Sequence, residues 1–208
     1  MKWPHWSTIF STKPKREEFR MDSIKAKPLW LRQTHADLQR HEGFRQYAYP
    51  DPLSKLGRKY VSRKWGWGFQ PGDVLLAKYG ENWKDGIPWT VGYGFTYKVT
   101  PSTKINKQAA DNMLEQVILD HLPVVDKMVP NWRKLPLFAQ TVVINMAFNL
   151  GSRLYQFKNS MKAISEGNYD LAARNLRKSL WASQVGPRAT ELINRLERRA
   201  IAREHLVV

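Results

Sequence analysis

The segment LFAQTVVINMAFNL at residues 137–150 constrains the fold more than any other part of the chain. It is apolar almost all the way round a helix, whereas a helix at a protein surface keeps one polar face. Such a helix needs other elements on every side. The sequence therefore predicts a helical bundle with residues 137–150 at its centre. A chain of 208 residues, 42% of them hydrophobic, is long enough to build that core.

Further helical patterns flank this segment. Asn106 is of a residue type that caps helices, and it precedes a helical pattern that continues through Asp120. Glycines at 151, 167 and 186 mark breaks between later helices. We expect these later helices at 157–165, 168–182 and 187–204.

The first hundred residues have a mixed pattern. Residues 28–42 suit a short amphipathic helix, and the sequence YAYPDP that follows suits an extended strand or turn. WTVGYGFTY at 89–97 alternates apolar residues with glycine, as a strand and turn do. Residues 53–87 between them are rich in Gly, Trp and Lys, with one short helix expected at 73–79. The prediction is an α+β fold with a short antiparallel sheet in a small N-terminal lobe, a larger helical C-terminal lobe, and a cleft between them.

The domain boundaries follow from these patterns. Residues 1–30 are basic, contain scattered prolines and show no sustained apolar period, so we interpret them as an N-terminal extension. Residues 31–208 form the domain, with lobes at 31–100 and 101–208 and an insertion at about 53–87. The sequence shows neither the apolar run of a signal peptide nor a stretch of about 20 apolar residues that would span a membrane.

The charge indicates an anionic partner. Lys and Arg number 34 against 18 Asp and Glu, a formal net charge of +16. Nucleic acid, an anionic membrane and the polymers of a bacterial wall all fit, and net charge does not separate them. The absence of cysteine excludes disulfides, thiolate metal sites and cysteine nucleophiles. The five histidines show no HExxH or paired spacing, so we expect no metal and no cofactor.

Two carboxylates can carry glycosidic hydrolysis when one is kept protonated and the other, ionised, activates water or acts as nucleophile. Glu42 and Asp51 lie nine positions apart, at the expected end of a helix and in the following turn. Among 18 acidic residues such a pair arises easily by chance. Spacing alone therefore leaves the pair a candidate.

The residues around this pair are more specific. HEGFRQYAYPDP, followed by PWTVGYG, resembles the catalytic segment of phage-type lysozymes. That family has a Glu-Gly pair at the end of its first helix, an aspartate nine residues later, and a threonine just before Gly-x-Gly. The resemblance implies that Glu42 is the general acid, that Asp51 is the carboxylate that activates or steers water, and that the hydroxyl of Thr90 helps to place the water.

The resemblance extends into the second half of the chain. INMAFNLG at 144–151 is similar to the family's central helix, which implies that Phe148 faces the glycan. FKNS at 157–160 and AARNLRKSLW at 172–181 imply substrate contacts by Ser160 and Asn175. QVGPRA at 184–189 implies that Arg188 approaches the catalytic acid.

Two features depart from the family pattern. Thr90 follows Asp51 by 39 positions, where the family has about six to nine, so roughly thirty residues must loop out. Asp85, only five positions before Thr90, is therefore an alternative second carboxylate. Phe95 stands where many members have histidine after the second glycine.

The resemblance implies a lysozyme-like fold and a muramidase that cleaves the β-1,4 bond between N-acetylmuramic acid and N-acetylglucosamine with inversion. The partner is then the peptidoglycan glycan strand, with the basic surface drawn to anionic wall or outer-membrane polymers. A monomer without specific nucleic-acid binding is expected, made in the host cytoplasm and delivered to the periplasm through a membrane pore or within a virion. A lytic transglycosylase, and a basic non-catalytic protein that binds wall or nucleic acid, stay open as alternatives.

Overall fold

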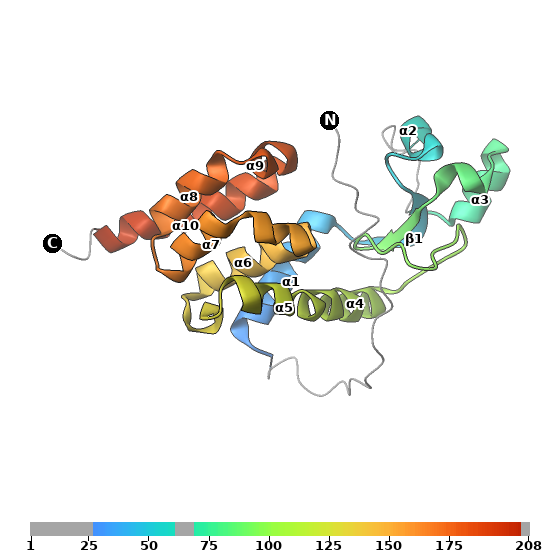
Figure 1. The fold of residues 1–208 in the computed structure, drawn as a ribbon. Helices are drawn as coiled ribbons and strands as arrows, with labels where there is room; N and C mark the ends of the chain where they lie inside the picture. Colours follow the sequence, from blue (N-terminus) through green and yellow to red (C-terminus); the bar gives the residue numbers. More distant parts are fainter. Residues whose placement is uncertain (1–26, 61–68, 205–208) are drawn as a thin grey trace. The chain divides into compact units, whose positions relative to one another are not determined.

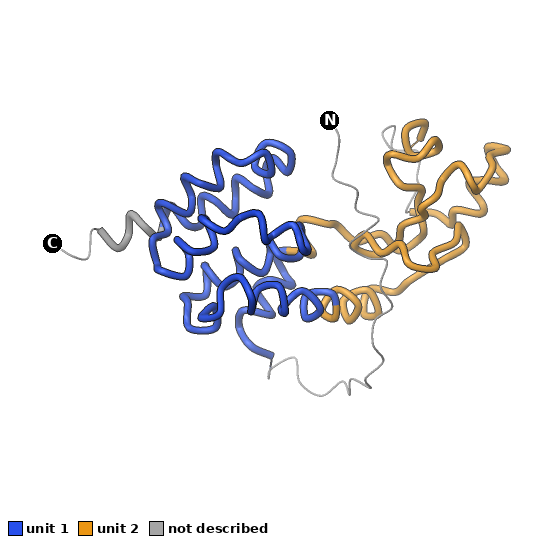
Figure 2. The backbone as a smooth tube through the Cα atoms, viewed as in Figure 1, with its two compact units in different colours: residues 1–4, 19–37, 117–208 blue, residues 5–18, 38–116 orange. Residues whose placement is uncertain are grey.

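We describe a computed structural model of the chain, in which residues 27–60 and 69–204 are described (Figure 1). The chain divides into two compact units (Figure 2). Among the described residues, unit 1 contains 27–37 and 117–204, and unit 2 contains 38–60 and 69–116. The division falls inside two helices, α1 (Leu29–Glu42) and α4 (Lys107–Asp120).

The remaining helices and strands are short apart from two. In unit 2 they are β1 (Arg45–Pro50), α2 (Lys55–Tyr60), α3 (Gly72–Tyr79), the 3-10 helix η3 (Trp83–Gly86) and β2 (Trp89–Gly92). In unit 1 they are α5 (Leu122–Met128), η4 (Trp132–Lys134), α6 (Leu137–Leu150), η5 (Gly151–Gln156), α7 (Lys158–Ser165), α8 (Tyr169–Arg177), α9 (Leu180–Val185) and α10 (Pro187–Glu204).

Helix α6 is the centre of unit 1, as its sequence predicts. Every residue from Thr141 to Leu150 is buried. Helices α5 and α10 and the 3-10 helices η4 and η5 all contact it. Thr141, Asn145 and Asn149 on this helix are buried too, so the bundle encloses polar side chains that need hydrogen-bond partners inside the protein.

The prediction of a single helix at 168–182 is wrong, because the chain forms two helices there. Helix α8 ends at Arg177, and α9 begins at Leu180. Ser179 between them has an extended backbone, and its hydroxyl accepts a hydrogen bond of 3.2 Å from the amide of Ala182. Serine is a strong N-cap, so it starts a new helix where the apolar pattern alone continues.

The sheet of unit 2 is a two-stranded antiparallel pair. β1 faces β2 with Tyr49 opposite Thr90 and Pro50 opposite Trp89, and the register shifts between Arg45 and Tyr49. α4 follows with the predicted cap, since the side chain of Asn106 accepts a 2.7 Å hydrogen bond from the amide of Ala109.

The described part of segment 53–87 forms three helices, where the sequence predicted one. α2 and α3 share a hydrophobic cluster with both strands: Ala48, Leu56, Tyr60, Leu75, Leu76 and Trp89. The indole N–H of Trp89 donates to the backbone carbonyl of Trp83 at 2.9 Å. The segment therefore packs against the sheet through its own apolar core. No helix in the described residues is long and apolar enough to cross a membrane.

Candidate active site

Glu42 is the last residue of α1 and is half-buried. The helix stops there because Gly43 adopts a positive φ of 67°, a conformation that favours glycine, and its amide closes the last turn on the carbonyl of Gln39 at 3.1 Å. The chain then enters β1 two residues later. The Glu-Gly pair thus places a carboxyl group where a helix turns into the sheet.

Asp51 lies directly after β1, in a turn that its own side chain helps to form. Its Oδ1 accepts a hydrogen bond of 2.7 Å from the amide of Leu53. Its amide donates to the carbonyl of Pro88 at 3.0 Å, which extends the pairing of the two strands. The residue is half-buried, so its carboxylate is held by backbone geometry while part of it stays accessible to water.

Thr90 and Tyr49 are directly opposite each other in the sheet, so their side chains share one face. Thr90 is buried, with 5% of its surface exposed. Among the described residues its hydroxyl makes no hydrogen bond. A hydroxyl in that position is available to another ligand, such as a water molecule.

Tyr49 connects these residues electrostatically. Burial raises the pKa of its hydroxyl to about 12; the positive charge of Arg45 lowers the pKa, and the negative charges of Glu42 and Asp51 raise it. Both carboxylates are therefore near enough to act on the same hydroxyl. Unit 2 brings together Glu42, Asp51, Thr90 and Tyr49, and the sequence motifs indicate the first three of these as candidates.

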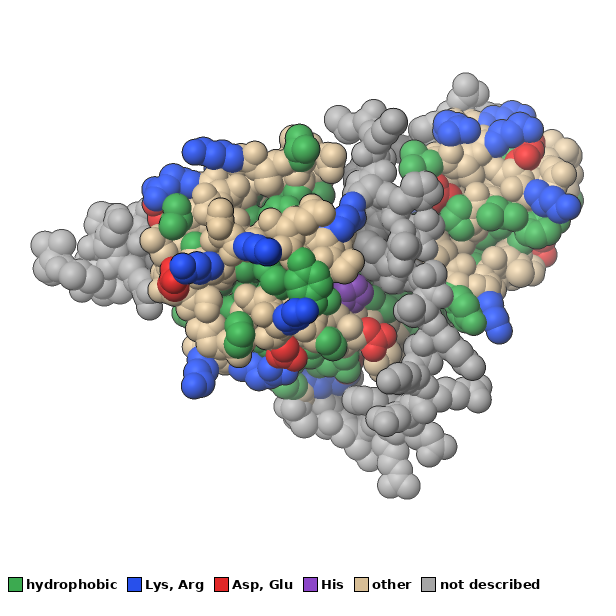
Figure 3. Space-filling view, viewed as in Figure 1, with side chains coloured by type: hydrophobic (Ala, Val, Ile, Leu, Met, Phe, Trp, Pro, Cys, Tyr) green, Lys and Arg blue, Asp and Glu red, His purple; other side chains and the backbone are tan. Residues whose placement is uncertain are grey.

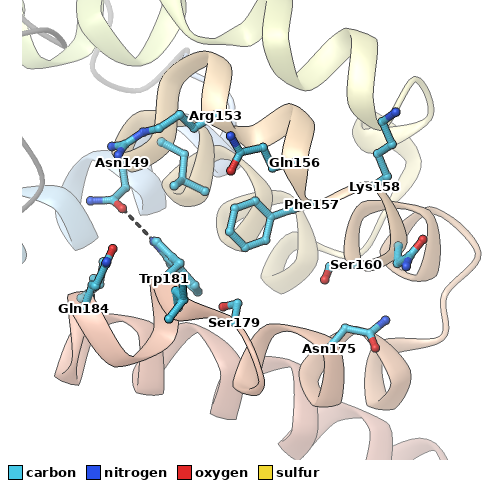
Figure 4. Close-up of a pocket in the computed structure, with 14 residues that line it drawn as sticks. Asn149, Arg153, Gln156, Phe157, Lys158, Ser160, Asn175, Ser179, Trp181 and Gln184 are labelled. Carbon is cyan, nitrogen blue, oxygen red and sulfur yellow. Dashed lines mark hydrogen bonds between the residues drawn. The ribbon is translucent and has the colours of Figure 1, made fainter.

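An open pocket of about 690 Å³ lies within unit 1, between the end of α6 and helices α7, α8 and α9 (Figure 4). Ser160 and Asn175, two of the predicted substrate contacts, line it together with Asn149, Phe157, Trp181 and Gln184. The indole N–H of Trp181 donates to Oδ1 of Asn149 at 2.8 Å (Figure 4). The pocket combines aromatic rings with amide and hydroxyl groups, the mixture that suits a sugar or a peptide.

The family model for phage lysozymes matches residues 76–200, well over half of the chain. The chain belongs to the phage lysozyme family. This is a family of muramidases, glycoside hydrolases that act on peptidoglycan. The match contains Thr90 and the pocket of unit 1 but begins after Glu42 and Asp51.

A solved structure shows the same fold. The muramidase domain of SpmX from Asticaccaulis excentricus is similar with a TM-score of 0.53 and 17% sequence identity, over 79% of this chain and 95% of that one. No curated protein matches the chain. The lysozyme-like fold, mostly helical with a short two-stranded antiparallel sheet, is thereby confirmed.

Asp85, the alternative second carboxylate of this phage lysozyme family member, lies on η3. Its Oδ2 forms an ion pair of 2.8 Å with the ammonium group of Lys55. The ion pair gives Asp85 a local role in joining η3 to α2.

Phe148 and Arg188 are not among the residues that line the pocket of unit 1. Phe148, expected to face the glycan, is completely buried and offers no surface to a ligand in this structure. The guanidinium of Arg188 lies 5.6 Å from the centre of its ring and donates to Oδ1 of Asn145 at 2.8 and 3.0 Å. Phe148 thus supports Arg188 from within the bundle, a placement that an apolar helix pattern does not reveal.

Two further polar residues emerge only from the structure. Asn149 and Asn145 are buried on successive turns of α6, and neither side-chain NH₂ group has a hydrogen-bond partner within the described residues. Buried amides of this kind are costly unless something binds them. Their position in an apolar run made them look like helix interior in the sequence.

Proposed function

We propose that this chain hydrolyses the β-1,4 bond between N-acetylmuramic acid and N-acetylglucosamine in peptidoglycan. Glu42 is the general acid, Asp51 is the carboxylate that activates or steers water, and the hydroxyl of Thr90 helps to place that water. Ser160 and Asn175 contact the substrate. Arg188, which lies over the ring of Phe148, holds the side-chain amide of Asn145 in the bundle. One observation carries this proposal. The negative charges of Glu42 and Asp51 both raise the pKa of the Tyr49 hydroxyl, and Tyr49 lies opposite Thr90 in the sheet.

The chemistry follows from these roles. Glu42 gives its proton to the glycosidic oxygen as the bond to the anomeric carbon breaks, so the leaving sugar departs neutral. A water molecule adds to the anomeric carbon from the opposite side and loses its proton to Asp51. Thr90 accepts or donates one hydrogen bond to orient that water. Attack from the face opposite the leaving group inverts the anomeric configuration.

Product analysis tests the reaction. Purified peptidoglycan is digested, and the fragments are identified by mass spectrometry. A hydrolase leaves a reducing-end muramic acid, whereas a lytic transglycosylase leaves a 1,6-anhydro end, and the latter product would contradict the proposal. Proton NMR of the freshly released reducing sugar reports the anomeric configuration, and initial release of the α-anomer is expected for inversion.

The excess positive charge supports attraction to anionic wall or outer-membrane polymers. From residue 151 onward the sequence has eleven Lys or Arg and five acids. Ion pairs occupy several of these cations, namely Lys162, Arg174, Arg177 and Arg195. Figure 3 shows Lys and Arg side chains scattered over the visible face of unit 1, with acids among them. We therefore propose a diffuse attraction that salt weakens, rather than a specific nucleic-acid site.

The biological setting is a further part of the proposal. A monomeric enzyme made in the host cytoplasm would reach the periplasmic peptidoglycan through a membrane pore or inside a virion. A wall-clearing assay on intact and on permeabilised cells tests whether the enzyme needs such a route. Clearing of permeabilised cells alone would show that it cannot reach the wall unaided. A protein that binds the wall or DNA and is inert in this assay would fit the non-catalytic alternatives.

A further inference from the structure

The turn that carries Asp51 is tied to helix α2 of segment 53–87. The backbone carbonyl of Asp51 accepts two hydrogen bonds from Ser54, one from its amide at 2.9 Å and one from its hydroxyl at 2.7 Å. The same hydroxyl accepts a hydrogen bond of 2.9 Å from the amide of Gly57. Ser54 thus joins Asp51 to the first turn of α2.

The far end of the segment holds the same turn from the other side. The amide of Asp51 donates to the carbonyls of Pro88 at 3.0 Å and Gly86 at 3.3 Å. The ion pair between Lys55 and Asp85 joins α2 to η3, so the two ends of the segment are connected beside Asp51. The two ends of the inserted segment of about thirty residues therefore both lie beside Asp51, the residue proposed to activate water.

Gly57 allows α2 to come this close. A Cβ atom at this position would overlap the carbonyl oxygen of Asp51 and would lie 2.8 Å from Cα of Pro52. Real Cβ atoms do not approach backbone atoms below 3.0 Å. Any larger residue must therefore push the Asp51 turn away from α2.

The carboxylate follows the backbone of this turn. Oδ1 of Asp51 is held by the amide of Leu53, and the carbonyl of Leu53 accepts a 2.7 Å hydrogen bond from the guanidinium of Arg58 on α2. A displaced turn therefore moves the carboxylate as well. Errors of about 1 Å in the position of a catalytic group can cost roughly a hundredfold in rate.

We propose that Ser54 and Gly57 are positioning residues that hold Asp51 for catalysis, and that α2 and η3 together serve as the scaffold of this carboxylate. The proposal rests on the proposed function, in which Asp51 handles water. Ser54 fixes the carbonyl of Asp51 by hydrogen bonds, and Gly57 sets how close the helix lies to it.

The first test compares two glycines of unit 2. Gly57→Ala should lower kcat by at least roughly tenfold with KM nearly unchanged, because the carboxylate is displaced while the substrate contacts stay. Gly80→Ala is the control, since its positive φ of 62° makes the substitution strained, while a Cβ there would meet nothing within 4 Å. Both variants are assayed at a temperature at which circular dichroism shows that they are folded. Equal losses of kcat in the two variants would overturn the proposal.

A second test substitutes Ser54 and does not depend on whether Gly57→Ala folds. Ser54→Ala should lower kcat by roughly three- to tenfold, and Ser54→Thr, which keeps the hydroxyl, should restore it. In an Asp51→Asn background neither Ser54→Ala nor Gly57→Ala should lower the residual rate further. Rate losses that multiply in this background would show that both residues act independently of Asp51.

The same series separates the two proposals. If Asp51→Asn keeps the wild-type rate, Asp51 does not handle water, and its assigned role and the positioning proposal fall together. If Asp51→Asn loses activity while Gly57→Ala and Ser54→Ala keep the wild-type rate, the role of Asp51 stands and only the positioning proposal is overturned.

Discussion

Thr90 on β2 lies directly opposite Tyr49 on β1, and the hydroxyl of Tyr49 is influenced by the charges of both Glu42 and Asp51. With a pKa of about 12, that hydroxyl stays neutral throughout the acidic and neutral range. It can therefore donate a hydrogen bond without titrating during catalysis.

Replacing Tyr49 with Phe should lower kcat by roughly fivefold, because the variant has no hydroxyl here to donate a hydrogen bond, worth about 1 kcal/mol, to the reacting water or sugar. The pH–rate profile should keep the limbs of the wild type, since Tyr49 does not change charge there. The measurement is kcat/KM from pH 4 to pH 9. A limb that disappears in Tyr49→Phe would show that this hydroxyl titrates in the reaction.

Glu42→Gln should reduce hydrolysis by about a hundredfold or more, because an amide cannot give a proton to the leaving oxygen. Wall clearing and release of reducing ends measure the loss, and the midpoint of thermal unfolding should stay close to that of the wild type. Glu166→Gln at an exposed residue is the matched control and should stay active. An active Glu42→Gln enzyme would remove Glu42 from the acid role.

Asp51→Asn should cost far more activity than Asp85→Asn. Asp51 acts on Tyr49 next to Thr90, whereas Asp85 is paired with Lys55 at 2.8 Å. Loss of a general base typically lowers kcat by about a hundredfold or more. The two variants carry the same chemical change in one unit, so each controls for the other. Greater damage from Asp85→Asn would exchange the two assignments.

Ser160→Ala and Asn175→Ala should raise KM severalfold with little change in kcat, since both residues line the pocket of unit 1 and neither belongs to the carboxylate cluster. Initial rates on soluble peptidoglycan fragments give both constants. Ser183→Ala on α9, exposed and outside the pocket lining, should behave as the wild type. A fall in kcat at constant KM would place these side chains in the chemical step.

Asp111→Asn should destabilise the protein in a pH-dependent way. Burial disfavours the charged form of Asp111, but hydrogen bonds from Lys107, Tyr93 and Gln39 outweigh it and hold the pKa of the carboxyl below its usual 3.8. A carboxyl group whose pKa is lowered on folding stabilises the folded protein at any pH above its pKa in the unfolded chain. This stabilisation is lost as the pH falls through the lower pKa of the folded protein.

The expected loss for Asp111→Asn is about 1 kcal/mol at pH 7, since Lys107 is largely exposed and its pairing is screened by water. The free energy of unfolding is measured by denaturant titration at pH 7 and again below pH 4. The difference between wild type and variant should shrink at the lower pH. A constant difference would show that the carboxylate charge does not contribute.

The sequence alone was sufficient to predict the helical bundle. An apolar surface all round residues 137–150 leaves burial as the only stable outcome, and α6 is buried as expected. The Glu-Gly pair and the WTVGYG pattern likewise predicted a helix end and a strand with a turn, because local backbone preferences decide such features.

Only the tertiary structure decided how these local features combine. Tyr49 gains its place in the candidate site from the register of β1 and β2, which pairs residues 41 positions apart. Segment 53–87 lacks a strong periodic pattern, so its helices and its hold on Asp51 depend on packing against the sheet. Phe148 is buried because α6 is enclosed from every side. Contacts between distant residues carry no signal in a single sequence, and they determine where each side chain of the site lies.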